Sequence, residues 1–427
     1  MRLNQRSCIV MKKNKEFEFK PFSRKQKQLL FWWTEDSPHK DKDTVIADGS
    51  IRSGKTIAMI ASFLMWSQYT FSGEDFILAG KTIGALKRNV IKPMLQILNT
   101  WQWEYKYNRS ENYIIIGSNT YYMFGANNEA SQDVLQGLTA AGALADEVTL
   151  FPENFVEQMI GRCSVEGSKI FMNCNPGSPF HYVKTEFIDK ATEKQVYHLH
   201  FTLDDNLTLS ERIKERYRKM FTGLFYKRYI LGLWVLAEGV IYDMFDTDKH
   251  VIQEIPECDE YIVSIDYGTG NPTVFLLIGI KDGKYYVMDE YYYSGRDKGR
   301  QKTDSEYADD FKEFVKGRRI SAIYADPSAA SFITELRKRG HYVIPADNAV
   351  LDGIRYVANL ISQNRLFVHE KCRNTITEFT VYSWDPKAAQ RGEDKPLKEH
   401  DHTMDALRYG ICSHSSRRVV RLTTVRW

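Results

Sequence analysis

The chain has 427 residues, of which 43% are hydrophobic and 26% charged, and its formal net charge is +3. This composition is that of an ordinary soluble globular protein, and at about 100–200 residues per domain its length predicts two or three domains. The small net charge excludes a polycation, so any nucleic-acid surface must be confined to a groove or a tail.

Cysteine spacing and apolar runs exclude further classes of protein. The six cysteines lie far apart and include no Cys-x-x-Cys pair, which argues against a zinc site and a disulfide framework. No apolar run reaches the roughly 18 residues of a membrane span, and residues 1–20 lack the apolar core of a signal peptide. We therefore expect a cytoplasmic protein without a membrane partner.

The first segment, residues 1–20, is polar and basic and is expected to be a flexible arm. From Pro21 the sequence predicts a capped helix ahead of a glycine-rich loop. The side-chain amide of Gln26 or Gln28 in this helix can read the edge of an adenine base. A solvent-exposed glutamine on a helix is the alternative, and the residues leave it open.

The glycine-rich loop has the pattern Gly-x-x-x-x-Gly-Lys-Thr, with an apolar strand before it and an apolar helix after it. Strand, loop and helix in this order are typical of a phosphate-binding loop. Its glycines let backbone N–H groups face phosphate oxygens, its lysine contacts the β- and γ-phosphates, and its threonine hydroxyl binds Mg²⁺. The predicted nucleotide ligands are Gly49, Ser53, Gly54, Lys55 and Thr56.

The next elements are predicted by apolar runs and turn residues. Residues 76–80 form a second strand, followed by a helix that ends near Leu98. Residues 113–116 and 120–124 flank Gly-Ser-Asn, which indicates a hairpin.

An apolar run beginning at Leu144 ends in two adjacent carboxylates, Asp146 and Glu147. In a P-loop sheet, an aspartate at a strand end holds the Mg²⁺ water shell beside the threonine hydroxyl, here Thr56. A glutamate that follows is placed to deprotonate the water that attacks the γ-phosphate. The pair therefore predicts ATP and Mg²⁺ as ligands, and a solvated strand end is the plain alternative.

A third strand, residues 169–174, ends at Asn175-Pro176-Gly177. A polar side chain at this position can sense the γ-phosphate, which makes Asn175 a candidate nucleotide ligand. The same tripeptide is a turn signal, and the residues alone do not decide between the two.

Residues 203–233 are polar and helical, with basic side chains interleaved among aromatic ones. They suit a lid, a DNA-facing helix or a solvated amphipathic helix. The stretch from Leu231 to Tyr242 is expected to link two domains.

The second half of the chain begins another α/β pattern. Residues 261–268 predict a buried strand, and residues 274–280 and 285–289 predict two strands of a hairpin around Asp-Gly. A helix at about 305–317 and a strand at 320–325 follow.

Carboxylates stand at three element ends in this half. Asp266 lies on the first strand, Asp326 follows the last one, and Asp405 lies three residues after His402 on one face of a late helix. Three such carboxylates are costly to bury without partners, and a shared divalent metal site removes that cost. Aspartates that merely cap turns or helices are the alternative.

These motifs together resemble the large subunit of the terminase of tailed double-stranded DNA bacteriophages, the motor and nuclease that packages the viral genome. The resemblance covers the chain from Pro21 to Ser413. The segments that carry it, by their order and spacing, are Gly49–Thr56, Ala145–Glu147, Asn173–Pro176, Gly232–Tyr242, Asp266–Gly268, Ala325–Pro327 and His402–Tyr409.

The resemblance implies an N-terminal P-loop ATPase of the ASCE type with a mainly parallel sheet, and a C-terminal α/β nuclease of the ribonuclease H/integrase type. The implied organisation is a flexible basic arm at 1–20, an ATPase core at 21–202, a lid or linker at 203–240, a nuclease at 241–414 and a basic tail at 415–427. That tail suits nucleic-acid contact, docking of a partner or a disordered solubilising role.

The resemblance also implies roles for single residues. In the ATPase, Arg52 would stabilise charge near the γ-phosphate, Glu147 would be the catalytic base, and Asn175 would couple hydrolysis to movement. Arg162 is the candidate for an arginine that acts on a neighbouring subunit.

In the nuclease, the resemblance implies His402 as an auxiliary ligand or proton-transfer group, with His400 and Asp401 as near duplicates one turn away. It implies Mg²⁺ or Mn²⁺ ligands at Asp266, Asp326 and Asp405.

The implied partners are double-stranded DNA, a portal protein, a small terminase subunit and further copies of the chain in a ring, by resemblance a pentamer. The implied location is the cytoplasm of the infected bacterial host, transiently on the procapsid and not in the mature virion. Two alternatives remain at this point: a P-loop helicase or repair translocase whose second half only binds DNA, and a structural ring subunit with a degenerate nuclease fold.

Overall fold

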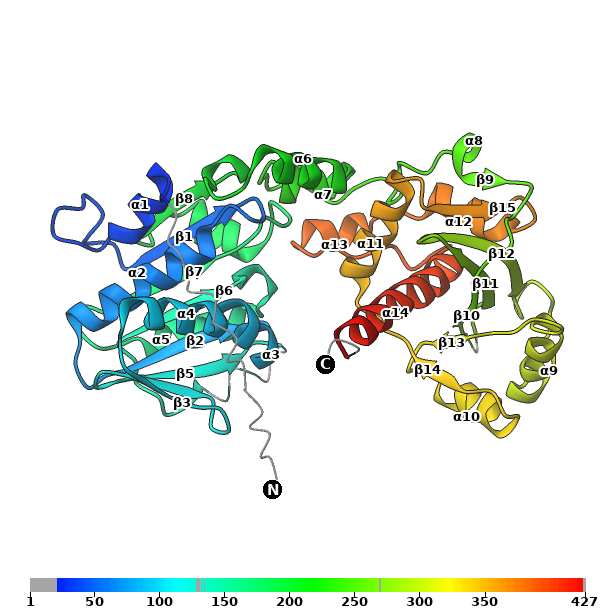
Figure 1. Cartoon of the computed structure of the whole chain (residues 1–427), viewed down its shortest axis with the longest axis horizontal. Coiled ribbons are helices and arrows are strands. Elements are labelled where there is room, and N and C mark those ends of the chain that lie inside the picture. The colour runs from blue at the N-terminus through cyan, green and yellow to red at the C-terminus, as the bar shows by residue number, and fades with distance from the viewer. Residues whose placement is uncertain (1–20, 128–130, 132, 134, 269, 425–427) are drawn as a thin grey trace, which may run out of the picture. The chain divides into compact units, whose positions relative to one another are not determined.

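The computed structural model describes residues 21–424 except 128–130, 132, 134 and 269, with backbone alone for 417–424. The predicted arm at 1–20 and the last three residues of the tail lie outside the described residues. The chain forms two compact units (Figure 1): the first comprises the residues up to Pro176 with Tyr182–Glu211, and the second Gly177–His181 with the residues from Arg212 on. The residue limits of the domains predicted from the sequence stay predictions.

The first unit is built on an eight-stranded sheet with the order β3-β4-β5-β2-β6-β7-β1-β8. Its strands are β1 (Thr44–Gly49), β2 (Asp75–Gly80), β3 (Tyr105–Asn108), β4 (Tyr113–Ile116), β5 (Asn119–Gly125), β6 (Gly142–Asp146), β7 (Lys169–Asn173) and β8 (Val196–Phe201). Only β4 runs antiparallel to its neighbours. The carboxyl ends of β1, β6 and β7 therefore meet at one edge of the sheet, where α/β proteins bind ligands.

The helices of this unit are α1 (Arg24–Phe31), α2 (Lys55–Thr70), α3 (Ile83–Leu86), α4 (Lys92–Trp101) and α5 (Glu153–Arg162). The helix α2 is apolar on nearly every face, so it is buried against β6 and β7 (Figure 1). The ring of Phe63 on α2 packs at 5.8 Å from that of Phe76 and 5.2 Å from that of Phe171. This aromatic core holds the helix in place behind the glycine-rich loop.

The helix that was expected to end near Leu98 is not a single α-helix. A π-helical turn, Lys87–Ile91, separates α3 from α4, which continues to Trp101. Such turns carry an extra residue and occur often at functional sites. This one brings Arg88 and Asn89 to a cavity described below.

The second unit is built on a seven-stranded sheet with the order β14-β13-β10-β11-β12-β15-β9. Its strands are β9 (Val251–Ile252), β10 (Glu260–Asp266), β11 (Thr273–Lys281), β12 (Lys284–Tyr293), β13 (Ala322–Ala325), β14 (Val343–Pro345) and β15 (Leu366–His369). The three central strands are antiparallel, and β13 pairs with β10 in parallel. Asp282 and Gly283 have φ angles of 50° and 73°, so the predicted hairpin turn is present.

Nine α-helices accompany this sheet among the described residues. They are α6 (Glu211–Met220), α7 (Gly223–Tyr229), α8 (Thr247–His250), α9 (Asp304–Phe314), α10 (Ala330–Lys338), α11 (Val350–Ser362), α12 (Arg373–Val381), α13 (Pro386–Gln390) and α14 (His402–Thr424). Most of the predicted tail thus continues α14.

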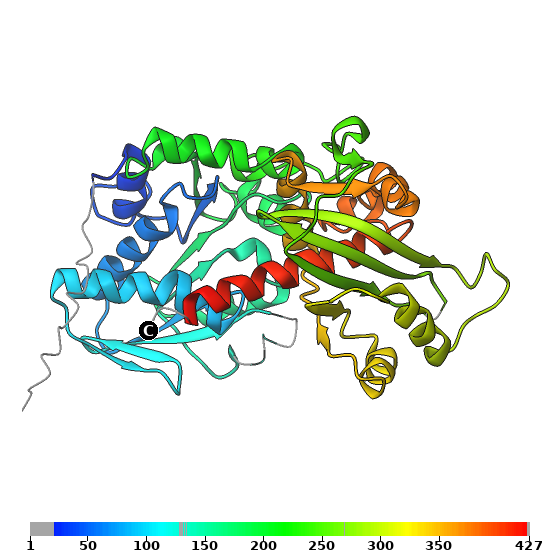
Figure 2. The ribbon, with the colours of Figure 1, turned by 45° about the vertical axis from the view of Figure 1, so that its right-hand side comes forward.

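The helix α14 packs on β10, β11 and β13 (Figure 2, red). A Cβ atom on Gly410 would lie 2.8 Å from the Cβ of Ser264 on β10, so the missing side chain permits this close approach. The approach places the first turns of α14 beside the end of β10.

The polar helical stretch predicted at 203–233 corresponds mainly to α6 and α7. Arg228 of α7 is 4% exposed, forms an ion pair with Asp394 and donates from Nε to the carbonyl of Val235 at 3.1 Å. These partners offset the free-energy cost of burying the Arg228 charge. The ion pair also connects α7 to the loop before α14. No helix among the described residues is long and apolar enough to span a bilayer.

Candidate nucleotide and nuclease sites

Two glycines shape the loop between β1 and α2. Gly49 has φ 126°, and a Cβ atom there would lie 1.8 Å from the carbonyl oxygen of Phe201 on β8. Gly54 has φ 84° and is the N-cap of α2, so no side chain caps the first N–H groups of the helix. These groups, at the positive end of the helix dipole, are available to an anion.

A cavity of about 530 Å³ opens over this loop. It brings together residues predicted from separate parts of the sequence. The predicted residues that line it are Arg52, Ser53, Gly54, Lys55, Thr56, Asp146, Glu147 and Asn175.

Lys55 lines this cavity and is buried. Its Nζ donates to Oδ1 of Asn175 at 2.8 Å and to the carbonyl of Ser50 at 3.1 Å. Burial lowers the pKa of Lys55, and nearby carboxylates, including Asp146, oppose that change. Asn175 therefore contacts the phosphate-binding lysine, and residues 175–177 form no turn, which favours the prediction of a nucleotide ligand over that of a turn.

The Asp146 carboxylate ends β6 beside the Thr56 hydroxyl. Its Oδ1 accepts from Nδ2 of Asn173 at 2.8 Å, and the side chains of Thr56 and Asn89 also hydrogen-bond to it. Burial raises the pKa of Asp146, and these hydrogen bonds counter the rise. A hydroxyl and a carboxylate side by side are the oxygen donors that Mg²⁺ prefers, so they fit the predicted ion.

Glu147 follows in a left-handed conformation, with φ 62°. Its backbone N–H donates to Oδ1 of Asn173 at 3.2 Å. Such a conformation is uncommon for a residue with a side chain and is found at functional sites, where surrounding contacts impose it. Asn173 thus positions both acidic residues, a role that the sequence did not reveal.

Two buried hydroxyls in the loop, those of Ser50 and Ser53, have no hydrogen-bond partner among the described residues. Buried polar groups are nearly always satisfied, and the oxygens of a bound phosphate would satisfy these. Together with the buried Lys55 ammonium, these hydroxyls form a set of hydrogen-bond donors that fits the phosphates of a nucleoside triphosphate.

The structure distinguishes the two candidate glutamines. Gln26 is 5% exposed, and a Cβ atom on Gly54 would lie 2.2 Å from its Nε2, so its amide lies against the loop. Gln28 is exposed on α1. Gln26 also accepts from the N–H of Ser23 at 2.9 Å through Oε1, which closes the capping box of α1.

Arg52 and Asn206 also line the cavity, whereas Arg162 does not. Arg52 is exposed with φ 56° at the cavity, and Nδ2 of Asn206 donates to its carbonyl at 2.6 Å. Asn206 was missed because a single asparagine carries no recognisable sequence signal. Arg162 ends α5 and contacts Gln158 at 3.4 Å, away from the cavity wall, so its action on a neighbouring subunit stays a prediction.

Asp48, just before the loop, is a buried carboxylate with two imidazole partners. Its Oδ1 contacts Nε2 of His198 at 2.8 Å and Nδ1 of His200 at 3.1 Å, both on β8. Burial raises the pKa of Asp48, but these two contacts outweigh it and hold the pKa well below its usual range. A lowered folded-state pKa stabilises the fold above the unfolded pKa of about 3.9, and this stabilisation is lost as the pH falls.

We expect Asp48→Asn to lower the free energy of unfolding by about 1–3 kcal/mol at pH 7, because it removes the charge from two hydrogen bonds. The difference from the wild type should begin to shrink as the pH falls below about 3.9, because the unfolded chain then takes up a proton that the folded Asp48 still resists. Urea denaturation between pH 3 and pH 7 measures both effects. Asp189→Asn, at an exposed ion pair with Lys184, is the control and should change little. A difference that does not depend on pH would contradict the assignment.

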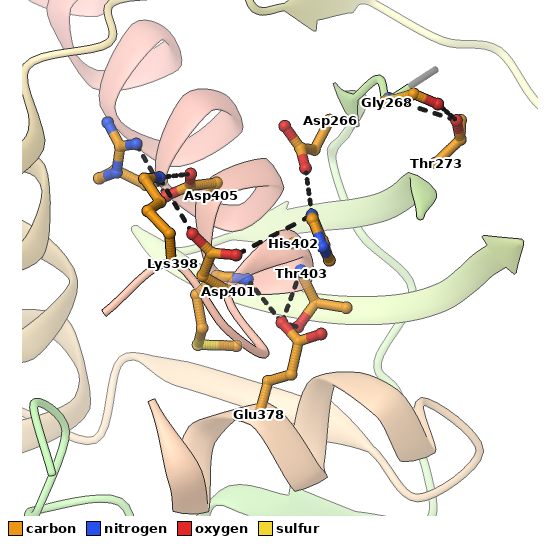
Figure 3. Close-up of polar contacts among 11 residues, drawn as sticks. Asp266, Gly268, Thr273, Glu378, Lys398, Asp401, His402, Thr403 and Asp405 are labelled. Atoms are coloured by element: carbon orange, nitrogen blue, oxygen red, sulfur yellow. Dashed lines mark hydrogen bonds and ion pairs between the residues drawn. The ribbon is translucent and has the colours of Figure 1, made fainter. Parts of the chain in front are cut away.

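Two of the three aspartates predicted in the second unit, Asp266 and Asp405, lie where α14 crosses the end of β10 (Figure 3). The third, Asp326, follows β13, the strand beside β10, and is linked to them through Tyr409. Nδ1 of His402 contacts Oδ2 of Asp266 at 3.1 Å. The Tyr409 side chain hydrogen-bonds to Asp326 and is close enough to Asp266 and Asp405 to feel both charges. His402 thus contacts Asp266 directly, and Tyr409 links Asp326 to the other two aspartates.

The charged side chains of this cluster shift one another's pKa values. Burial raises the pKa of Asp266, and the carboxylates of Asp405 and Asp401 raise it further. Burial lowers the pKa of His402, but its contact with Asp266 outweighs this and raises it. Asp326 has a lowered pKa, because hydrogen bonds from Ser328 and Tyr409 outweigh its burial.

Oxygen donors of this kind are preferred by Mg²⁺ and Mn²⁺, so the chemistry of the cluster fits a divalent cation. The side chains are not arranged as a ready-made metal centre: the described part of the chain contains no group of three or more His, Cys, Asp or Glu residues in a position to hold a metal. Asp405 instead pairs with Arg408 and Lys398, both at 2.9 Å. Cation binding thus requires these side chains to move.

The structure adds Glu378 to this site and separates the two near duplicates named from the sequence, Asp401 and His400. Glu378 on α12 caps the first turn of α14: its Oε2 accepts from the N–H and the hydroxyl of Thr403, both at 2.7 Å. Asp401 is 3% exposed and lies 4.0 Å from Nδ1 of His402. His400, the near duplicate in sequence, is exposed with φ 52° outside the helix.

Comparisons with known proteins agree with both halves of the fold. A family model described as "Terminase large subunit, T4likevirus-type, N-terminal" matches residues 46–249, and one described as "Terminase RNAseH like domain" matches residues 266–412. The curated large terminase subunit of Escherichia phage T5 is 29% identical over 234 residues, which cover 51% of this chain and 51% of that protein. The match thus spans about half the length of this relative.

The large terminase of a thermophilic bacteriophage is similar along nearly the whole chain. Its solved structure is 51% identical, covers 91% of this chain and 98% of its own, and has a TM-score of 0.88. Structures of the same protein in complex with ADP and with ATP-γ-S each have a TM-score of 0.85.

These matches confirm the predicted fold class, a P-loop ATPase domain with a mainly parallel sheet followed by a ribonuclease H-like α/β domain. They also agree with the resemblance drawn from the order of the motifs. The chain belongs to the family of bacteriophage terminase large subunits.

Proposed function

We propose that this chain is the motor subunit that packages viral DNA, using ATP hydrolysis to move double-stranded DNA into a procapsid and a metal-dependent endonuclease to cut concatemers. The observation that carries the proposal is the cavity over the loop, where Lys55, Thr56, Asp146, Glu147 and Asn175 converge. The complexes of the thermophilic phage terminase with ADP and ATP-γ-S support a nucleotide there.

In the ATPase, Lys55 would contact the β- and γ-phosphates of ATP, and Thr56 and Asp146 would hold Mg²⁺. Glu147 orients and deprotonates the attacking water, and Arg52 stabilises the charge that develops on the γ-phosphate. Asn175 is hydrogen-bonded to Lys55, so a shift of the lysine on phosphate release is transmitted to the end of β7. We assign the ATPase core to 21–202 and the lid or linker to 203–240.

In the nuclease, which we assign to 241–414, the residues that would hold Mg²⁺ or Mn²⁺ are Asp266, Asp326 and Asp405. The bound cations would supply positive charge that stabilises the attacking and leaving oxygens in phosphodiester hydrolysis. His402 orients Asp266 through their 3.1 Å contact and can hold a proton at Nδ1.

The partners proposed with this function are double-stranded DNA, a portal protein, a small terminase subunit and further copies of the chain in a pentameric ring. The proposed location is the cytoplasm of the infected host, on the procapsid during packaging and outside the mature virion. Membership of the terminase family supports this set.

The test is cleavage of supercoiled plasmid by the full-length chain with Mn²⁺, with Mg²⁺ and with EDTA. We expect nicking and linearisation that require the metal, and a loss of at least about a hundredfold in Asp266→Asn, because one charged donor is worth several kcal/mol at such a site. Asp259→Asn, outside the cluster, is the matched control and should cut normally.

Two outcomes would contradict the nuclease assignment. Equal cleavage by wild type and Asp266→Asn would place the activity elsewhere. A folded wild type that hydrolyses ATP but cuts with neither metal would favour a DNA translocase whose second unit only binds DNA.

A further inference from the structure

The loop between α13 and α14 inserts a lysine into the nuclease cluster. Nζ of Lys398 lies 3.0 Å from Oδ2 of Asp401 and 2.9 Å from Oδ2 of Asp405 (Figure 3). One ammonium thus bridges two carboxylates that are themselves 3% and 5% exposed. The predictions from the sequence gave this lysine no role.

The second cation on Asp405 is held quite differently. Nη2 of Arg408 lies 2.9 Å from Oδ1 of Asp405, three residues earlier on the same helix. Arg408 is 2% exposed and packed against α11, where a Cβ atom on Gly353 would lie 2.4 Å from its Cδ. Arg408 is therefore a fixed partner that leaves Oδ2 of Asp405 to another group.

Lys398, by contrast, is a removable partner. Its side chain is 68% exposed, and it comes from a loop rather than from the helix that carries Asp405. Water reaches the ammonium but hardly reaches the two carboxylates, so the carboxylates need a positive partner while the long lysine chain loses freedom when it is held. A divalent cation brings that positive charge itself and can take the place of the ammonium.

We propose that Lys398 is a built-in counter-ion of the nuclease site, which occupies Asp401 and Asp405 until a divalent cation displaces it. The inference rests on the proposed nuclease function. A cation that coordinates Oδ2 of Asp405 would share that oxygen with Nζ, which lies 2.9 Å from it, and the two positive charges repel at such a short distance. The lysine therefore lowers the affinity of the site for metal. DNA phosphates offer the released ammonium a new partner, so DNA and metal favour each other's binding.

The test is a titration of the full-length chain with Mn²⁺ in the absence of DNA. Electron paramagnetic resonance measures the free Mn²⁺ at each point. Binding at the nuclease site is the part that Asp266→Asn removes. We expect Lys398→Gln to lower the Kd of this part about threefold to tenfold, because one competing positive charge is removed from the site. Lys398→Arg keeps the charge and should retain the wild-type Kd.

Lys395→Gln is the matched control. Lys395 lies three residues earlier in the same loop, is 63% exposed and pairs with Glu393 at 2.9 Å, outside the cluster. Its loss should leave Mn²⁺ binding unchanged. Lys398→Met, which keeps the aliphatic stem, is a second neutral variant if the glutamine variant folds poorly.

The outcomes separate this inference from the function on which it rests. An unchanged or higher Kd in both neutral Lys398 variants overturns the counter-ion assignment, and a higher Kd would make Lys398 a positioning residue instead. If Asp266→Asn removes no Mn²⁺ binding, the metal site itself is wrong, whatever the lysine variants do. A second readout is DNA: added duplex should lower the Kd for Mn²⁺ more in wild type than in Lys398→Gln.

Discussion

Replacing Glu147 by glutamine is expected to slow ATP hydrolysis by about 10²–10⁴-fold while ATP binding is retained. The change removes a proton acceptor from the cavity but keeps the shape of the side chain. The binding groups belong to other residues: the loop N–H groups, the Lys55 ammonium and the hydroxyl of Thr56. Phosphate release measures turnover, and the affinity for a fluorescent ATP analogue measures binding.

The control for this prediction is Glu157→Gln, an exposed carboxylate on α5, which should leave both measurements unchanged. A Glu147→Gln variant that turns over ATP at the wild-type rate would exclude Glu147 as the base. Loss of ATP binding would instead indicate that the left-handed turn at Glu147 shapes the cavity.

Gly49→Ala is expected to destabilise the first unit by more than about 4 kcal/mol, within the range reserved for severe backbone conflicts. The new Cβ would overlap the carbonyl oxygen of Phe201 at 1.8 Å, and alanine rarely adopts a φ of 126°. Relief requires β8 to separate from β1, which also displaces the start of the phosphate-binding loop. Chemical denaturation monitored by fluorescence, together with ATP binding, measures the effect.

Gly161→Ala is the control for this second prediction. Gly161 lies in α5, where an added Cβ atom would have no heavy atom within 4 Å, and alanine in a helix is favoured over glycine by about 0.5–1 kcal/mol. Its stability should be equal or slightly higher. A Gly49→Ala variant as stable as Gly161→Ala would mean that the β1–β8 pairing tolerates a shift.

Local patterns in the sequence were enough to find most of the two candidate sites. The glycine-rich loop, the carboxylates after Leu144 and the hairpin at Asp282-Gly283 each depend on neighbouring residues, so their conformations follow from propensity and turn chemistry. The order of these motifs along the chain also carried the family resemblance. Asp266, Asp326 and Asp405 could be proposed as a group because strand ends and helix starts are where such side chains converge.

Contacts between distant segments were decided only by the tertiary structure. The sequence could not choose Gln26 over Gln28, because the choice depends on how α1 packs against Gly54. It could not foresee the π-helical turn that brings Asn89 to Asp146, nor Asn206 at the loop.

The nuclease cluster shows the same division. The spacing of His402 and Asp405 on one helical face was readable from the sequence alone, since it follows from the period of the helix. That His402 rather than His400 reaches Asp266 depends on where α14 begins, and Glu378 on another helix helps to set that point. The ammonium of Lys398 joins the cluster through a loop that has no periodic pattern. The sequence by itself thus determined which chemical groups the protein carries and in what order. Tertiary packing decided which of these groups are in contact, because burial and hydrogen bonding between remote segments have no local signature in the sequence.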